Sequence, residues 1–445
     1  MLIAITTDSA VKLQNFNSML KQFLYFKPIF DKFFKLYRMP RWLIPLLITC
    51  FVFLTVELYT FQAIKTLTKS KWLRWIWIFV GVAIYMHLFY VLFTTPRSAG
   101  QTNQFQWAVG LLMTSLIPKI VILAMMFGED VFRWFQKLIS YVSKEETQAL
   151  VGRRRFVSQL AFGLAAIPFA GIIYGMIKGK YNYKVLKYQL TFKDLPDAFE
   201  GFTITQFSDI HSGSFTNAEK IQYGVDMINE QESDLILFTG DIVNNKADEM
   251  DNWIEMFGKL EAPYGKYSIL GNHDYGDYVD WETPEDKKKN FQKVKDIHPK
   301  IGFDLLLNEH RYIEKDGQKI ALIGVENWGK GFKRTGDLEK AAAGVQQEDF
   351  KIVMSHDPSH WDLKIKEADL KYHLTLSGHT HGLQMGIEIP GFFRWSPSQY
   401  AYKQWAGMYE ELGRYINVNR GFGYHAFPGR VGIWPEVTVI ELKKA

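Results

Sequence analysis

The hydrophobic and polar positions divide the chain into two parts with different patterns. Up to about residue 180, the apolar residues form four long runs, which cover 42–62, 75–93, 105–127 and 156–177. A helix needs about 20 mostly apolar residues to cross the hydrocarbon core of a bilayer. Each run is bounded by Trp, Tyr, Lys or Arg, as is typical of spans that end at the membrane interface. The pattern predicts an all-α region of four transmembrane helices over 41–178.

From about residue 199 onward, short apolar runs alternate with amphipathic stretches. The short runs have the length and composition of buried strands, and the amphipathic stretches predict helices over 217–230, 247–260, 285–297 and 338–347. This alternation is typical of a layered α/β domain. We therefore expect an α/β domain over 200–445, with 179–199 forming either a linker or the first strand.

Two strongly polar side chains interrupt the apolar runs. Glu57 lies in the first run, and Lys119 follows Pro118 in the third. Ionisable residues inside a membrane usually face a bundle interior or a cavity, where they can pair. We interpret both as structural, because two such residues are fewer than a transport pathway needs.

Positive charge in the loops predicts the side of the membrane on which the α/β domain lies. Lys and Arg are concentrated in the loops after the first and third runs, whereas the loop after the second run carries only Arg97. Because these residues favour the cytoplasmic side, we expect a multi-pass protein of the cell membrane with an extracytoplasmic α/β domain. The basic segment 1–40 conflicts with this orientation, unless translation starts at Met39.

The start of the fourth run agrees with this orientation. The stretch RRRFVSQLAFGLAAIPFAG, from Arg153, resembles a twin-arginine export signal followed by an apolar segment. Alternatively, Arg153, Arg154 and Arg155 simply anchor the cytoplasmic end of a helix. No small-x-small cleavage site follows, so we expect the segment to remain as an anchor.

Composition adds three limits. The net charge of +5 is too small to indicate a nucleic-acid partner, and the basic residues lie beside apolar stretches, as expected at a membrane surface. Cys50 is the only cysteine, which excludes an intrachain disulfide and a thiolate metal cluster. Membrane lipids are therefore expected partners and nucleic acid is not, while the sequence does not determine the oligomeric state.

Side chains that can bind metals follow nearly every short apolar run of the second part. FTITQFSDIHSG contains Asp209 and His211, DLILFTGDIVNN contains Asp241, YSILGNHDYG contains Asn272, His273 and Asp274, FKIVMSHDPSH contains His356, and LTLSGHTHG contains His379 and His381. The carboxyl ends of neighbouring strands face one crevice, so these side chains are expected to meet there. Two residues apart in an extended segment, His379 and His381 point to opposite faces. If both bind metal, they therefore serve two neighbouring ions.

Taken in order, the motifs DxH, GD, GNHD, H and GHxH resemble those of the calcineurin-like metallophosphoesterases, and in particular the membrane-anchored members of that superfamily. The match extends from about residue 201 to residue 440. The resemblance implies an α/β fold, a four-layer αββα sandwich, and a site for two divalent metal ions. Asp, His and Asn ligands without a thiolate suit Mn, Fe or Zn.

The resemblance also implies a role for each motif residue. One ion is held by Asp209, His211 and His381, the other by Asn272, His356 and His379, and Asp241 bridges both. His273 acts on the phosphate or the leaving-group oxygen, and Asp274 fixes its orientation. The alternative is that His273 is itself a metal ligand.

Two further positions bear on substrate binding. Arg420, in INVNRGFG, either contacts substrate phosphate, as the resemblance implies, or is a solvated residue of a surface turn. Leu383 departs from the expected pattern, which has a second glycine after the His-x-His-Gly, and this puts the fit of the substrate in question. Five histidines after residue 200 have no motif context and are interpreted as structural: His298, His310, His360, His373 and His425.

The stretch from 384 to 412 is unusually aromatic for a loop. It contains Phe392, Phe393, Trp395, Tyr400, Tyr402 and Trp405. An exposed aromatic patch beside the metals would suit a lipid-bearing substrate or the bilayer surface. The alternative is a second small core over the edge of the sheet.

These observations lead to a membrane-anchored binuclear metallophosphoesterase. We expect it to hydrolyse a phosphodiester, pyrophosphate or phosphomonoester on a lipid-linked or cell-envelope substrate. The resemblance leaves hydrolysis of the pyrophosphate of UDP-2,3-diacylglucosamine, in lipid A synthesis, as an alternative that requires the opposite topology. A non-catalytic membrane receptor is a second alternative, although all the expected ligands are present.

Overall fold

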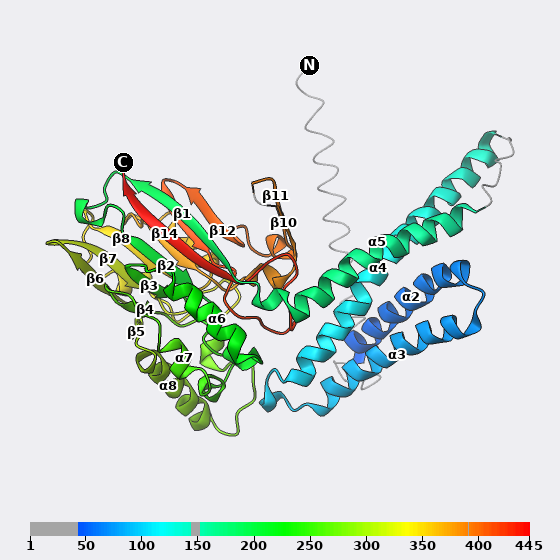
Figure 1. Cartoon of the computed structure of the whole chain (residues 1–445), viewed down its shortest axis with the longest axis horizontal. Coiled ribbons are helices and arrows are strands. Elements are labelled where there is room, and N and C mark those ends of the chain that lie inside the picture. Colours follow the sequence, from blue (N-terminus) through cyan, green and yellow to red (C-terminus); the bar gives the residue numbers. More distant parts are fainter. Residues whose placement is uncertain (1–42, 144–151, 390) are drawn as a thin grey trace, which may run out of the picture.

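A computed structural model describes residues 43–143, 152–389 and 391–445, in which a helical region lies beside a β-sandwich (Figure 1). The basic segment 1–40 and the alternative start at Met39 lie outside the described residues.

Four helices form the first region: α2 (Leu43–Leu67), α3 (Lys71–Thr94), α4 (Asn103–Ser143) and α5 (Arg153–Ile177). Each is long and apolar enough to cross a membrane, as the four apolar runs predict. Large side chains such as Phe51 and Phe79 remain mostly exposed on this region, as expected of a surface that faces lipid. Helix α4 is longer than predicted, and α4 and α5 extend farther from the sandwich than α2 and α3 do (Figure 1).

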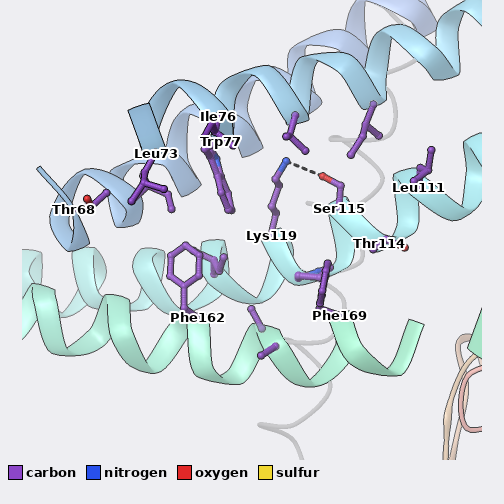
Figure 2. A pocket seen from close by; sticks show the side chains of 17 residues that line it. Thr68, Leu73, Ile76, Trp77, Leu111, Thr114, Ser115, Lys119, Phe162 and Phe169 are labelled. Atoms are coloured by element: carbon purple, nitrogen blue, oxygen red, sulfur yellow. Dashed lines mark hydrogen bonds between the residues drawn. The ribbon is translucent and has the colours of Figure 1, made fainter. Parts of the chain in front are cut away.

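The polar residues of the spans meet inside the helical region. The Lys119 ammonium pairs with the Glu57 carboxylate and donates a hydrogen bond to Ser115 Oγ at 2.8 Å (Figure 2). Tyr85 donates to Glu57 Oε1 at 2.8 Å. Gly81 leaves room for this carboxylate, because a Cβ at that position would lie 2.9 Å from Glu57 Oε1. Lys119 lines an apolar cavity of about 580 Å³ between α2, α3, α4 and α5.

The arginines at the start of α5 are held by acidic residues of α4. Arg153 lies 3.3 Å from Glu129, and Arg154 lies 3.2 Å from Glu129 and 2.5 Å from Asp130. These ion pairs fasten the beginning of α5 to α4 and give the arginines a structural role. Whether the segment also acts as an export signal stays a prediction.

The second region contains two six-stranded sheets that pack face to face. The first sheet has the order β1 (Lys184–Phe192), β14 (Glu436–Lys444), β2 (Thr203–Phe207), β3 (Leu235–Phe238), β4 (Lys266–Ser268) and β5 (Asp304–Leu305). The second has the order β12 (Gly407–Glu411), β13 (Arg414–Val418), β9 (Leu374–Ser377), β8 (Phe350–Met354), β7 (Gln318–Gly324) and β6 (Glu309–Lys315). A small separate hairpin pairs β10 (Ile387–Ile389) with β11 (Phe393–Trp395). The segment 179–199 supplies the first strand, since β1 pairs in parallel with β14.

Side chains from both sheets fill the space between them, including Ile204 and Leu237 of the first sheet and Leu322 and Ile352 of the second. Helices α6 (Ala218–Asn229), α7 (Ile254–Phe257) and α8 (Pro284–Lys300) cover the outer face of the first sheet, and α9 (Leu338–Ala341) packs on the second. The αββα layers behind a four-helix region confirm the predicted fold class.

Two of the predicted helices differ from the prediction. The stretch 247–260 is divided between a short helical turn at Ala247–Met250 and α7. The stretch 338–347 contains only the short helix α9, because the chain soon reaches Gly344, whose φ of +93° a helix cannot adopt.

The buried ion pair of the helical region gives a first prediction. Replacing Lys119 by Met leaves the Glu57 carboxylate buried without its cation, so we expect a loss of about 3 kcal/mol in stability. Adding Glu57→Leu to the same protein should recover most of this loss, because the pair is then replaced by apolar groups. Thermal unfolding of the full-length protein in detergent measures both. A double variant less stable than Lys119→Met would contradict the structural role of the pair.

Candidate metal centre

The predicted ligands lie in loops at the carboxyl ends of central strands. Asp209 and His211 follow β2, Asp241 follows β3, His356 follows β8, and His379 and His381 follow β9. All of these except His356 have a left-handed backbone, with φ between 48° and 73°. This conformation is strained in residues other than glycine and is found most often where function requires it. The bends turn side chains from both sheets into one crevice.

A first group consists of Asp209, His211 and His381, whose ligand atoms all lie within 4.8 Å of one another. Asp209 Oδ1 is 3.2 Å from His381 Nε2 and 3.9 Å from His211 Nε2. Burial alone raises the pKa of Asp209, but the neighbouring His381 and His356 lower it below its usual range. The carboxylate is therefore ionised and buried, which favours a cation beside it.

A second group consists of Asp241, His356 and His379, again with all ligand atoms within 4.8 Å. Asp241 Oδ2 lies 3.0 Å from His356 Nε2 in this group and 3.7 Å from His211 Nε2 in the first. Burial alone lowers the pKa of His356, but the Asp241 carboxylate raises it to about 10. Asp241 therefore stands between the two groups, where a ligand shared by two ions would stand.

The unsatisfied atoms of these groups fit a metal site. His356 Nε2 and His381 Nε2 are buried, and although each lies near a carboxylate oxygen, neither makes a hydrogen bond. His356 Nδ1 lies 2.7 Å from the Thr239 carbonyl, which can only accept, so Nδ1 carries a proton and Nε2 is the nitrogen that would bind a metal, in place of the proton that Asp241 otherwise stabilises on the ring. Buried polar atoms are rarely left unpaired, and a cation would satisfy these.

Asn272 lies next to the second group. Its Oδ1 is 2.8 Å from His379 Nδ1, and its amide nitrogen donates to Tyr278 Oη at 2.8 Å. The structure thus brings all seven predicted ligands into one region, and their assignment to particular ions stays a prediction.

His273 and Asp274 lie close to the groups but are arranged differently from the prediction. His273 Nδ1 is 2.7 Å from the carbonyl of Asn244, so this carbonyl, and not Asp274, orients the ring. The Asp274 carboxylate accepts backbone N–H groups from Asp241 at 3.0 Å, Ile242 at 2.9 Å and Gly271 at 2.8 Å. Asp274 therefore holds together the two loops that carry Asp241 and Asn272.

A pocket of about 430 Å³ opens over the two groups. Its lining includes three residues that sequence reasoning did not select, Gln101, Tyr278 and His425, together with Tyr402 of the aromatic stretch. Tyr402 Oη is 2.7 Å from His379 Nε2. The His425 ring lies 4.8 Å from that of His211 and 4.5 Å from that of His273, so it belongs to the site and not to the structural histidines. Gln101, Tyr278 and His425 come from segments without a motif, and no signal in the sequence marks them.

Arg420 is not among the residues that line this pocket. Its guanidinium is buried and pairs with Glu436 and, at 2.6 Å, with Glu388. The expectation of a solvated surface arginine is therefore wrong. To contact a substrate phosphate, the Arg420 guanidinium would have to leave one of the two carboxylates that it already binds. In this structure it does not reach the pocket, so the phosphate-binding role has no support from its position.

The loop after the histidines also differs from a simple turn. Leu383, where a glycine was expected, has a φ of +48°, and its side chain is 57% exposed at the pocket. In the aromatic stretch that follows, Phe392 and Tyr400 are exposed, but Trp405 is buried with Ala406 and Ile433. The predicted patch is thus divided, because part of the stretch forms a small core.

Two family models match adjoining parts of the chain. The first describes a probable calcineurin-like phosphoesterase transmembrane domain and matches residues 40–180. The second describes calcineurin-like phosphoesterases and matches residues 202–383.

Individual relatives agree with these models. The chain is 32% identical over 299 residues to an uncharacterized metallophosphoesterase, YkuE, of Bacillus subtilis, covering 66% of this chain and 98% of the relative. It is 26% identical over 372 residues to a transmembrane protein with metallophosphoesterase domain of Danio rerio, covering 81% of this chain and 77% of that protein. It is also 26% identical to the phosphodiesterase YaeI of Escherichia coli, over 66% of this chain and all of the relative.

Metal binding at these groups should stabilise the fold. We expect Mn²⁺ added to the metal-free protein to raise the melting temperature, since an ion at 100 times its Kd contributes about 2.7 kcal/mol. Asp241→Asn keeps the shape of the side chain but removes its charge, and it should abolish most of this rise. Asp248→Asn, at an exposed position, should leave the rise unchanged. Equal rises in both variants would show that the ion binds elsewhere.

Proposed function

Since the chain belongs to the calcineurin-like phosphoesterase family, we propose that it is a membrane-anchored, metal-dependent hydrolase of a phosphate ester. The observation that carries this proposal is the position of the Asp241 carboxylate, 3.0 Å from a histidine of one group and 3.7 Å from a histidine of the other. In this proposal residues 41–178 form the membrane anchor and residues 200–445 the catalytic domain.

The proposed metals are two divalent ions, Mn, Fe or Zn. Asp209, His211 and His381 would hold one, Asn272, His356 and His379 the other, and Asp241 both. When bound, such a pair supplies positive charge for the phosphoryl oxygens and a water of lowered pKa. The donor set supports this assignment, because its nitrogen and oxygen atoms suit these ions.

The protein's own contribution to the reaction is to orient the phosphate and to move a proton. His273 lines the pocket, and its Nδ1 donates to the Asn244 carbonyl, which leaves Nε2 for a substrate oxygen. We assign to Nε2 a hydrogen bond to the phosphate or the leaving-group oxygen. Asp274 acts indirectly, since it fixes the backbone that carries Asp241 and the loop before His273.

A lipid-linked or cell-envelope phosphate ester is the proposed substrate. The pocket supports this assignment because Gln101, which belongs to the connection between α3 and α4, forms part of its lining. Substrate therefore reaches the ligands next to the ends of two membrane-spanning helices. A phosphodiester is favoured among the three ester types. The relative from Escherichia coli, which matches this chain over its whole length, is described as a phosphodiesterase.

Activity and metal content separate the proposed roles. The full-length protein, stripped of metal and reloaded with Mn²⁺ or Zn²⁺, should hydrolyse bis-p-nitrophenyl phosphate. We expect His273→Ala to lower kcat by about 10²-fold or more while metal content per chain stays unchanged, as for loss of a proton-transfer group. His310→Ala, far from the pocket lining, serves as the matched control.

Two outcomes would overturn parts of this scheme. A fall in metal content with His273→Ala would make His273 a ligand. Metal-loaded protein without turnover on any phosphate ester, mono or di, would leave a binding role in place of hydrolysis.

We propose that the catalytic domain lies outside the cytoplasm, and this orientation has its own test. In a Cys50→Ser background, Ala343→Cys places a thiol at an exposed position of the domain, and Lys69→Cys places one in the loop between α2 and α3. A membrane-impermeant maleimide applied to intact cells should label the first and not the second, as the positive charges of that loop predict. The reverse labelling would place the catalytic domain in the cytoplasm.

A further inference from the structure

A second cavity lies between the membrane region and the catalytic domain, beside the metal pocket. Its volume is about 330 Å³, within the range of ligand pockets, roughly 300 to 1,000 Å³. The lining comes from the last turn of α3, the α3–α4 connection, the first turn of α4 and two loops of the catalytic domain. It belongs to neither of the two metal-binding groups.

The part of this cavity that lies in the membrane region is apolar. Val91 and Leu92 belong to the end of the candidate span Lys71–Thr94, and Phe105 to the start of the next. Leu92 is 50% exposed, so this wall is open at its outer side toward the lipid that surrounds α3. A hydrocarbon chain can therefore reach the cavity from the bilayer without crossing water.

Charge changes at the boundary of the span. Arg97 also lines the cavity, and its only ion pair among the described residues is with Asp280, at 3.7 Å and with both side chains about 70% exposed. An exposed pair of this kind contributes little, so the guanidinium can turn to another anion. Along the cavity, the apolar wall is thus followed by a cation. An anionic lipid has the matching order, a hydrocarbon chain followed by a charged headgroup.

The inner end of the cavity adjoins the metal pocket, because Gln101 and Tyr278 line both. Gln101 contacts the His425 ring with its amide nitrogen, and its Oε1 accepts the Ala426 N–H at 2.9 Å. The Tyr278 ring lies 4.5 Å from that of His273. A molecule that fills both cavities therefore passes directly from α3 to the proposed catalytic side chains.

The two regions are packed tightly enough to keep this arrangement. Gln106 of α4 donates to Ser214 Oγ at 2.9 Å, and Met176 of α5 packs against Phe427. A Cβ on Gly175 would lie only 2.6 Å from the Arg430 carbonyl, so the glycine allows helix and loop to touch. These contacts hold α4 and α5, and with α4 the connection that lines the cavity, against the catalytic domain.

We propose that the substrate is a phosphate ester of a membrane lipid that enters sideways from the bilayer. Its hydrocarbon chain lies in the second cavity against Val91, Leu92 and Phe105, and its phosphate lies beside Asn272 and His273. This inference rests on the proposed hydrolase function and adds to it the route and the chain-binding site. Gln101 and Tyr278 stand where the apolar chain gives way to the phosphate.

A chain-length series tests the route. The full-length protein, loaded with Mn²⁺ in detergent micelles, is assayed on methyl and dodecyl p-nitrophenyl phosphate, and the ratio of the two kcat/KM values is measured. In the wild type the ratio should favour the dodecyl ester by about tenfold or more, since burial of each methylene contributes to binding. Leu92→Trp fills the cavity and should bring the ratio close to one.

The matched control is Leu54→Trp, at a comparably exposed leucine of α2 that lies outside both cavities. It should keep the wild-type ratio, so that partition of the ester into micelles is not mistaken for binding. A dodecyl preference that survives Leu92→Trp, or a wild-type ratio near one, overturns the inference while leaving the hydrolase function intact. Failure of the wild type to hydrolyse either ester overturns the proposed function itself.

Discussion

The metal centre depends on a carboxylate that is held, buried and ionised, between two groups of histidines. Asp241 occupies this position, and its surroundings leave it little freedom. A Cβ on Gly271 would lie 2.2 Å from Asp241 Oδ1, so the residue before Asn272 has to be glycine for the loops to approach. Gly240, with a φ of +97°, makes the turn that precedes Asp241. The glycines of the two motifs are thus required by the position of one side chain.

A buried anion of this kind has to be held by groups that are themselves fixed. His273 donates its backbone N–H to Asp241 Oδ1 at 2.8 Å, and the Asp241 N–H donates to the Asp274 carboxylate. Burial and the charge of Asp241 raise the pKa of Asp274 to about 7. The two carboxylates therefore oppose each other electrostatically while hydrogen bonds to the backbone keep both in place.

The sequence predicts a structural feature correctly where the residue types in it are compatible with only one environment. The four apolar runs predict the spans, since only lipid tolerates them, and the strand-end motifs predict the crevice. The burial of Trp405 and Arg420 was harder to predict, because an aromatic ring or a guanidinium can be buried or exposed according to its neighbours. Gln101 and His425 could not be found, since they meet only after the helical region has docked on the sandwich.

Docking of the helices also reaches the metal groups through Arg430. Its backbone N–H donates to the carbonyl of Gly175 at 3.2 Å, at the end of α5, and its guanidinium lies 3.0 Å from His381 Nδ1. The same guanidinium donates to the carbonyl of Gly423 at 2.6 Å. A shift of α5 relative to the sandwich would therefore move the residue that contacts a predicted ligand. The helices do more than attach the domain to the bilayer, because the end of one of them helps to position the site.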